Sequence, residues 1–302
     1  MSKNILITGA SGLIGTRLTE LLHDNGDRIA HLSRTLRSGK AKTFLWDVDK
    51  NKMDGDALKA TDAIIHLAGA GIADKSWSKS RKIEIVKSRV DSTRLLYEEL
   101  KKGNHKVRSF ISASAIGIYR LEDHNTLITE ASRYGTDFIS AVVRKWEDEI
   151  DQIATLGIRV VKIRIGIVLS DKGGALKEMM RPINFYAGAP LGTGEQSISW
   201  IHLDDLCNIF IKAVEDETME GVYNGVAPNP VTNKELTKKL ASALHKPIIL
   251  PSIPAFVVKI LLGEMGDLVL KGGQVSSHKI QNAGFQFKFN KVEEALEDLL
   301  VN

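Results

Sequence analysis

Residues 5–15 read ILITGASGLIG, a short apolar run that leads directly into glycines spaced as GxxGxxG. The run predicts a buried strand and the residues after the loop predict a helix, so the glycines form the turn between them. In such a turn Gly9 allows a sharp bend, Gly12 lets a diphosphate approach the backbone, and Gly15 lets helix and strand pack closely. The helix N-terminus adds amide donors for an anion. The pattern predicts a dinucleotide site, with a ligand-free glycine turn as the alternative, and its residues are Thr8, Gly9, Ser11, Gly12, Leu13, Ile14 and Gly15.

The chain around this loop alternates short apolar runs with helical patterns, which is typical of parallel strands joined by crossover helices. The apolar runs are nearly continuous, as expected for strands covered on both faces. Together they predict a doubly wound parallel sheet of the Rossmann type. The expected strands are residues 4–8, 28–33, 43–46, 63–67, 107–112 and 160–165, and the expected helices are residues 13–23, 78–102 and 136–156.

This regular alternation ends after residue 165, where glycines and prolines cluster and indicate irregular connections. We expect an α/β fold in two parts. Residues 1–170 would form the dinucleotide-binding domain, to which a later strand can return, and residues 171–302 a smaller, loop-rich C-terminal α/β lobe. The helical patterns of that lobe cover residues 233–244, 255–262 and 292–300.

Composition narrows the classes of partner. The 41 basic and 37 acidic residues leave a net charge of +4 without a basic run, so we expect no nucleic-acid partner. The late apolar segment 253–270 is interrupted by charges and glycines, so we expect no membrane span. The single cysteine, Cys207, and the lack of metal-ligand spacing predict no metal site. A cytoplasmic monomer or homodimer acting on a small molecule fits these features.

The end of the second expected strand bears on the choice of dinucleotide. An NAD site usually has an acid there for the ribose 2′-hydroxyl, whereas an NADP site has a cation for the 2′-phosphate. Here the residues are Ser33 and Arg34, and a guanidinium suits phosphate. The sequence thus predicts NADP in preference to NAD, a solvated loop arginine being the alternative.

These motifs resemble a known superfamily. The glycine loop followed by HLAG at residues 66–69 resembles the extended and atypical short-chain dehydrogenase/reductases, which include the nucleotide-sugar epimerases. The later motifs resemble its NAD-dependent epimerase-like subgroup with a C-terminal domain of unknown function. They run in order over nearly the whole chain. Those later motifs are RIGIVL at 164–169, GGAL at 173–176 and SWIH at 199–202.

The resemblance implies further cofactor contacts. Leu67 and Ala68 would line the adenine-side ribose, and Val168 would lie near the nicotinamide. Glu84 and Arg89 would face the cofactor from the following helix. For Glu84 and Arg89 the alternative is a pair of surface charges without a ligand.

The catalytic pair of the superfamily is missing from its expected place. Short-chain reductases use a Tyr and a Lys four residues later on the helix after the fifth strand. Here those positions hold Ile139 and Val143. The same spacing occurs at Tyr97 and Lys101, but before the fifth strand. Ordinary dehydrogenase chemistry is therefore in doubt.

Other polar residues could contribute to catalysis or to substrate binding. Ser114 matches the serine with which members of the superfamily polarise the substrate, and Tyr119 could act as a relocated proton donor. The alternative is that Ser114 caps a turn and that Tyr119 is packed in the core with its hydroxyl hydrogen-bonded. Glu130 would orient a substrate or cap its loop. His202 and Asp205 resemble a segment that closes the site, although a lone His is more often structural.

Two functions remain open. The first is an NADP-dependent oxidoreductase or epimerase-like enzyme acting on a small polar or nucleotide-linked substrate between the two parts of the chain. The second is a non-catalytic NADP(H)-binding redox sensor or regulatory protein, which would explain an intact cofactor loop beside a missing catalytic pair. Fold alone cannot choose between them.

Overall fold

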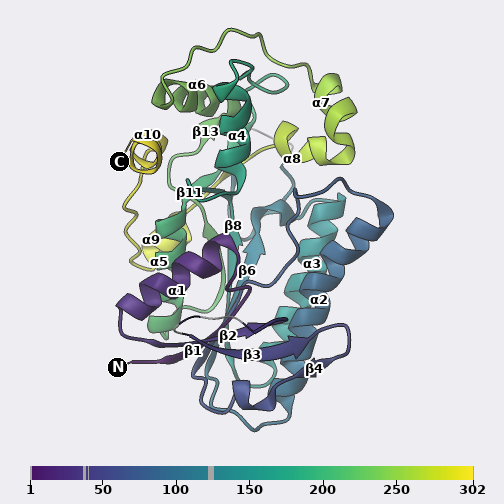
Figure 1. Ribbon diagram of the computed structural model, residues 1–302, viewed down its shortest axis with the longest axis vertical. Coiled ribbons are helices and arrows are strands. Elements are labelled where there is room, and N and C mark those ends of the chain that lie inside the picture. Colours follow the sequence, from purple (N-terminus) through teal and green to yellow (C-terminus); the bar gives the residue numbers. More distant parts are fainter. Residues whose placement is uncertain (1, 37–38, 40, 122–125, 302) are drawn as a thin grey trace.

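The computed structural model describes residues 2–36, 39, 41–121 and 126–301. Within these residues the main element is an eight-stranded sheet in the order β12-β8-β6-β5-β1-β2-β3-β4 (Figure 1). All neighbours pair in parallel except the short edge strand β4, which is antiparallel to β3. Its strands are β1 (Asn4–Thr8), β2 (Arg28–Ser33), β3 (Lys42–Asp47), β4 (Lys52–Met53), β5 (Ala63–His66), β6 (Ser109–Ala115), β8 (Arg159–Ile165) and β12 (Gly221–Gly225).

Helices cover both faces of this sheet. On one face α2 (Lys79–Lys101) packs beside α3 (Phe138–Ala154), and on the other α1 (Leu13–Asp24) packs beside α5 (Leu203–Glu215), as Figure 1 shows. The central strand β5 is accordingly buried along its whole length, with Ile64 and Ile65 at 0% exposure. The doubly wound parallel sheet predicted from the sequence is confirmed.

The loops after β1 and β5 are locked together by one threonine. Thr8 pairs with His66 in the register of the two strands. Its hydroxyl oxygen accepts hydrogen bonds from the backbone amides of Leu67 (3.1 Å) and Ala68 (3.2 Å) and lies 2.8 Å from Nδ1 of His66. The segment after β5 is therefore held directly beside the glycine loop.

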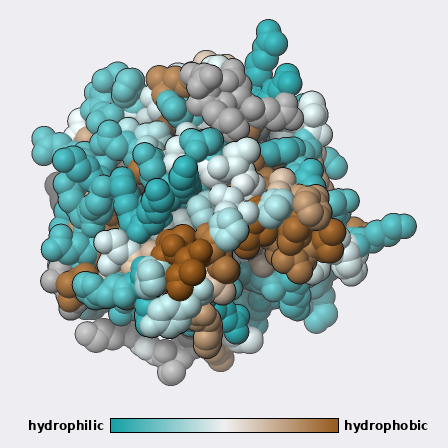
Figure 2. Space-filling view, turned by 90° about the horizontal axis from the view of Figure 1, so that it is seen from above, coloured by the Kyte–Doolittle hydropathy of each residue, from teal (hydrophilic) through white to brown (hydrophobic). Residues whose placement is uncertain are grey.

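A smaller lobe lies above the carboxyl edge of the sheet in Figure 1 and has its own apolar cluster. Figure 2 views the molecule from above this lobe and shows brown patches of apolar side chains. In the lobe, Phe256, Ile260 and Leu261 of α7 are 65%, 76% and 73% exposed. The helices of the lobe are α4 (Ala175–Asn184), α6 (Asn233–Ala243), α7 (Ala255–Leu262), α8 (Asp267–Leu270) and α10 (Val292–Leu300). Helix α9 (His278–Asn282) packs instead against β12, and its Ile280 is buried in the main core.

Short pairs of strands and single helical turns complete the fold. The pairs are β10 (Ser197–Ile198) with β13 (Val231–Thr232), β11 (Trp200–His202) with β9 (Ile167–Leu169), and β14 (Gln274–Val275) with β7 (Leu127–Ile128). The turns are η1 (Gly55–Ala57), η2 (Ile116–Ile118) and η3 (Gly263–Gly266). None of the helices in the described residues is long and apolar enough to cross a bilayer.

The chain returns to the large sheet after the first crossing into the smaller lobe. Helix α5 and strand β12 lie within the expected C-terminal lobe but complete the large sheet and its helical cover, because Leu206 and Phe210 of α5 are buried in the main core. Helix α5 and strand β12 therefore pack with the large sheet, and the expected domain boundary at residue 170 stays a prediction.

Candidate cofactor site

A cavity of about 1240 Å³ opens at the carboxyl edge of the sheet, between the glycine loop and the ends of β2, β3 and β5. The walls bring together eight of the residues predicted to bind a cofactor, from four segments of the chain. They are Gly9, Ser11, Gly12, Ser33, Arg34, Leu67, Ala68 and Glu84.

Sterics of the glycine loop match the roles expected for its glycines. Gly9 has φ +68°, and a Cβ there would lie 2.7 Å from the carbonyl carbon of Leu67. A Cβ on Gly15 would lie 2.5 Å from the carbonyl oxygen of Gly9. Gly12 differs from these two glycines. A Cβ placed on Gly12 would approach only the carbonyl oxygen of Gly9, at 3.4 Å, so the protein leaves free space beside this residue. That free space, together with the absence of a side-chain cap at Gly12 in front of α1, fits a diphosphate approaching the first helical amides.

The other predicted cofactor residues lie around the cavity and not on its wall. Thr8 is fully buried and holds the loops together. Leu13 and Ile14 are partly buried against the main core, and Leu13 also lines a second cavity of about 730 Å³, which shares Ser11 and Gly12 with the first. Val168 pairs with Ile201 in the short β9–β11 ladder.

Arg89 is a buried cation beneath the cavity rim. It is 8% exposed, and its guanidinium donates to the carbonyl of Ile85 at 3.1 Å, lies over the ring of Trp146, and would be 3.1 Å from a Cβ on Gly69. Within the described chain no carboxylate pairs with it. Burial, with the nearby Arg81 charge, lowers the pKa of Arg89 to about 10. An uncompensated buried guanidinium is costly and is typical of a ligand site, so a solvated surface charge does not describe Arg89.

Glu84 belongs to a different environment. It is exposed and pairs with Arg81 at 2.7 Å, and this hydrogen bond lowers the pKa of the Glu84 carboxyl. Arg81 itself is 7% exposed and also donates to the carbonyl of Gly71. Sequence reasoning missed Arg81 because nothing in a helical pattern separates it from its neighbours. Asp47, the last residue of β3, and Val48, which follows it, also line the cavity. They were missed although they lie at the same edge of the sheet as Ser33 and Arg34.

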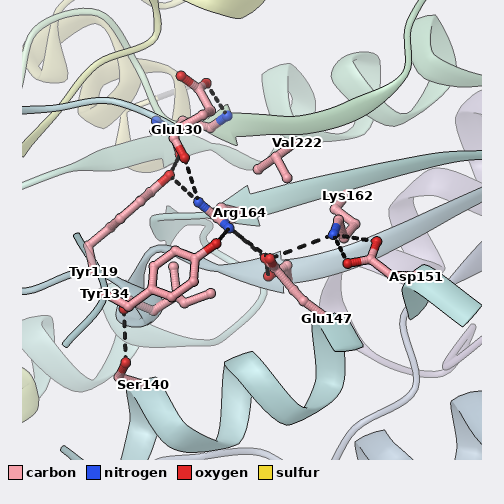
Figure 3. A network of polar contacts seen from close by, with 12 residues as sticks. Tyr119, Glu130, Tyr134, Ser140, Glu147, Asp151, Lys162, Arg164 and Val222 are labelled. Atoms are coloured by element: carbon pink, nitrogen blue, oxygen red, sulfur yellow. Dashed lines mark hydrogen bonds and ion pairs between the residues drawn. The ribbon is translucent and has the colours of Figure 1, made fainter. Parts of the chain in front are cut away.

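Ser114 and Tyr119 lie in one buried polar network that includes Glu147 and Arg164. Figure 3 shows Tyr119, Glu147 and Arg164 of this network. The Ser114 hydroxyl donates to Oε1 of Glu147 at 2.5 Å. The Tyr119 hydroxyl donates to Oδ1 of Asn224 at 2.7 Å and accepts from Nη1 of Arg164 at 2.9 Å. Burial raises the pKa of Tyr119 to about 12, although Arg164 acts in the opposite direction. Both hydroxyl protons are therefore engaged inside the protein, away from the cavity wall.

Glu130 joins the same network. Its side chain accepts from the backbone amide of Asn224 at 2.8 Å, and its carbonyl accepts from Nη1 of Arg164 at 3.2 Å (Figure 3). This geometry ties the segment after β7 to the edge strand β12. In this structure Glu130 positions backbone and does not line the cavity.

His202 and Asp205 anchor the C-terminal segment. Nδ1 of His202 accepts from the amide of Asp204 and so caps α5, while the His202 ring lies 3.9 Å from that of Phe289. The Asp205 carboxylate accepts from the amides of Lys288 (2.9 Å) and Phe289 (3.0 Å). Burial lowers the pKa of His202 and raises that of Asp205. His202 also lines the second cavity together with Ser11 and Gly12.

Comparison with known proteins shows to which family this chain belongs. A model of the NAD dependent epimerase/dehydratase family matches residues 5–141, and a model of a domain of unknown function, DUF1731, matches residues 253–299. The epimerase family protein YfhF of Bacillus subtilis is 35% identical over 99% of this chain and 98% of its own length. This chain belongs to the NAD-dependent epimerase/dehydratase family. The predicted resemblance is thereby confirmed.

Solved structures agree with this epimerase-family assignment. The crystal structure of human epimerase family protein SDR39U1, determined with NADPH, superimposes with a TM-score of 0.89 at 29% identity and covers 99% of both chains. A nucleoside-diphosphate sugar epimerase from Corynebacterium glutamicum superimposes with a TM-score of 0.82 at 29% identity, over 99% of this chain and 58% of that one.

The resemblance predicts the catalytic pair of the superfamily at two positions of α3 that are apolar in this chain. Ile139 and Val143 are 7% and 0% exposed on one face of α3, inside an apolar cluster. A Cβ on Gly117 would lie 2.6 Å from Cγ2 of Ile139, so the loop after β6 packs directly on this face. Tyr97 and Lys101 lie near the end of α2 that leads to the amino end of β6, at the sheet edge opposite the glycine loop.

Proposed function

We propose that this chain binds NADP(H) and acts as an oxidoreductase or epimerase-like enzyme on a small substrate held between the sheet and the smaller lobe. One observation carries the proposal: a single cavity joins the glycine loop to Ser33 and Arg34. The NADPH in the structure of the human relative supports the choice of cofactor.

Each part of the cofactor has candidate partners. The diphosphate would lie against the first amides of α1 beside Gly12, and the 2′-phosphate would lie against Ser33 and Arg34. Leu67 and Ala68 would line the adenine-side ribose. The nicotinamide, when bound, supplies hydride exchange. Val168 would lie near that end of the cofactor.

A second candidate is a non-catalytic NADP(H)-binding sensor. It is favoured by Ile139 and Val143, which cannot move a proton, and by the Ser114 and Tyr119 hydroxyls, which are engaged with Glu147 and Asn224. Binding of a partner protein that depends on the oxidation state of the cofactor would support this function.

The test is a titration of the full chain with NADPH, NADP⁺, NADH and NAD⁺, followed by cofactor fluorescence. We expect at least about tenfold tighter binding of the phosphorylated pair, equivalent to about 1.4 kcal/mol. No binding of any of the four would overturn the proposal. Hydride exchange with a panel of carbonyl compounds and sugar nucleotides at roughly 1–1000 turnovers per second would then favour the enzyme over the sensor.

A further inference from the structure

The second cavity, of about 730 Å³, adjoins the cofactor cavity at the glycine loop. Ser11 and Gly12 line both spaces, so a group bound beside Gly12 is open to both. The walls of the second cavity come from the glycine loop and α1, from residues 170–174, from the start of α5 and from the end of α10. The sheet with its helices and the smaller lobe therefore meet across this space.

Two helix N-termini lie at this cavity. Helix α1 starts after Gly12 and α4 starts after Gly174; both glycines line the cavity, and neither helix has a side-chain cap. A Cβ on Gly174, whose φ is +72°, would lie 3.2 Å from Cδ2 of Leu13, so the start of α4 packs against the first residue of α1. The first amides of a helix have no acceptor within it and carry a partial positive charge. Together the two helix ends offer amide donors to one ligand.

A buried donor without a partner lines the same cavity. His202 is 2% exposed, and its Nδ1 accepts from the amide of Asp204 at 3.1 Å, so the neutral ring carries its proton on Nε2. Nε2 has no hydrogen-bond partner among the described residues. Oδ2 of Asp298, which also lines the cavity, lies 3.4 Å from Nε2 without forming a hydrogen bond, so this side of the ring faces the cavity. A buried N–H without an acceptor is costly, which indicates a ligand oxygen that the chain itself does not supply.

The acidic side chains around this cavity are paired. Among the described residues each carboxylate that lines it has a cation of the chain beside it. The pairs are Arg17 with Glu20 (3.1 Å) and with Asp204 (2.7 Å), Lys172 with Asp171 (2.7 Å), and Lys288 with Asp298 (3.6 Å). Because these charges are compensated within the protein, the two helix ends and the His202 N–H determine which ligand group fits. All of them are donors, so the group that fits is an anion with several acceptor oxygens.

We propose that α4 completes the phosphate site of α1: the amides of Ala175 and Leu176 bind the diphosphate of NADP(H) from the smaller lobe, and Nε2–H of His202 donates to the same group. Each phosphate of the diphosphate carries a negative charge, so each helix end has a charge to stabilise. The inference rests on the proposed NADP(H) function, which places the diphosphate beside Gly12. Because α4 belongs to the smaller lobe, the bound cofactor ties this lobe to the glycine loop.

Removal of a single amide tests the α4 contact. Ala175 is the first residue of α4, a position that suits the φ of proline, so Ala175→Pro deletes the N–H donor and preserves the helix. The probes are NADP⁺ and adenosine 2′-monophosphate, which has the ribose phosphate but no diphosphate, each titrated calorimetrically into the full chain. We expect Ala175→Pro to weaken NADP⁺ binding by at least about tenfold. Binding of the monophosphate should stay unchanged, which also shows that the variant is folded.

Ala255→Pro is the matched control. Ala255 is the first residue of α7 in the same lobe, has no side-chain cap before it and lines neither cavity, so neither affinity should change. His202→Asn keeps an oxygen that can cap α5 but removes the Nε2–H donor, and it should also weaken only NADP⁺ binding. Unchanged NADP⁺ affinity in Ala175→Pro, or equal weakening of both probes, would overturn the proposal. Unchanged NADP⁺ affinity in His202→Asn would refute the contact from His202.

Amide hydrogen exchange of the wild-type chain gives a second readout. Saturating NADP⁺ should slow exchange in the first turn of α4, adenosine 2′-monophosphate should not, and the first turn of α7 should respond to neither. Unchanged exchange at α4 with NADP⁺ bound would refute the α4 contact and leave the proposed function intact. Failure of the chain to bind NADP⁺ would refute the proposed function. Inorganic pyrophosphate would then test the site, and no binding, or equal affinity for wild type and Ala175→Pro, would overturn it.

Discussion

Arg164 holds Glu147 with two parallel hydrogen bonds, from Nε to Oε1 at 2.8 Å and from Nη2 to Oε2 at 2.7 Å. The two side chains are 1% and 5% exposed, so this is a buried ion pair (Figure 3). Because Glu147 also accepts from Ser114, the pair fixes the end of β6 against α3.

Removal of one partner leaves the other charge buried. We expect Glu147→Gln to lower the free energy of unfolding by about 3–5 kcal/mol, measured by urea denaturation. Asp148→Asn, a neighbouring exposed carboxylate on α3, is the control and should change the free energy by less than about 0.5 kcal/mol. Equal effects of the two variants would show that the buried pair does not stabilise the fold.

Arg34 should discriminate between the two dinucleotides. In Arg34→Ala we expect NADP⁺ binding to lose about 1.5–3 kcal/mol, because a charge-assisted contact to the 2′-phosphate disappears, while NAD⁺ binding stays nearly unchanged. Arg28→Ala is a matched control, since this exposed arginine lies at the opposite end of β2. Titration of each variant with both cofactors measures the difference. Equal losses for NADP⁺ and NAD⁺ would refute the role of Arg34.

Gly15 is required by packing. A Cβ there would lie 2.5 Å from the carbonyl oxygen of Gly9 and 2.6 Å from Cα of Ala10, so Gly15→Ala must displace the loop or α1. We expect a loss of about 1–3 kcal/mol in unfolding free energy and at least tenfold weaker NADPH binding. Gly55→Ala is the control, because nothing lies within 4 Å of its Cβ position. Full cofactor affinity in Gly15→Ala would contradict this account of the loop.

We expect the buried Arg89 guanidinium to destabilise the cofactor-free protein. The guanidinium is buried without a carboxylate partner in the described residues, so Arg89→Met should raise the melting temperature of the cofactor-free chain. The same variant should bind NADPH at least about tenfold more weakly. Arg94→Met, on the exposed side of α2, should change neither quantity appreciably. A lower melting temperature together with unchanged NADPH affinity would make Arg89 a structural residue.

His66 should make stability depend on pH. Burial lowers the pKa of His66 to about 3, so the folded chain keeps the imidazole neutral while the unfolded chain protonates it near pH 6.5. The unfolded state then binds more protons, and stability should fall by about 1.4 kcal/mol per pH unit as the pH drops from 6.5 towards 3.

Comparison with a variant isolates this contribution. In His66→Gln, which can still bond to the Thr8 and Thr93 hydroxyls, the extra slope should disappear in urea denaturation at pH 7.5, 6.0 and 5.0. His23→Gln, an exposed histidine, should keep the wild-type slope. Parallel curves for wild type and His66→Gln would show that His66 does not contribute to the pH dependence.

Local patterns predicted much of the large sheet. The apolar runs at β1 and β5 and the helical pattern of α1 depend on neighbours a few residues away, so they can be recognised in the sequence. The glycine loop and Arg34 follow from the same information, because strand ends fall at one edge of a parallel sheet. Helix α4 was not predicted, because glycines precede it and Pro182 lies inside it.

The tertiary structure decided which polar side chains remain free to contact a ligand. Tyr119 is 105 residues from its partner Asn224, and Ser114 is 33 residues from Glu147, so no local pattern could show that their protons are engaged. The burial of Arg89 likewise depends on the packing of α2 against α3. The sequence alone therefore determined the fold class and the position of the phosphate loop, which rest on short-range periodicity and glycine sterics. Only long-range packing decided which polar side chains are held inside the core and which can meet a ligand.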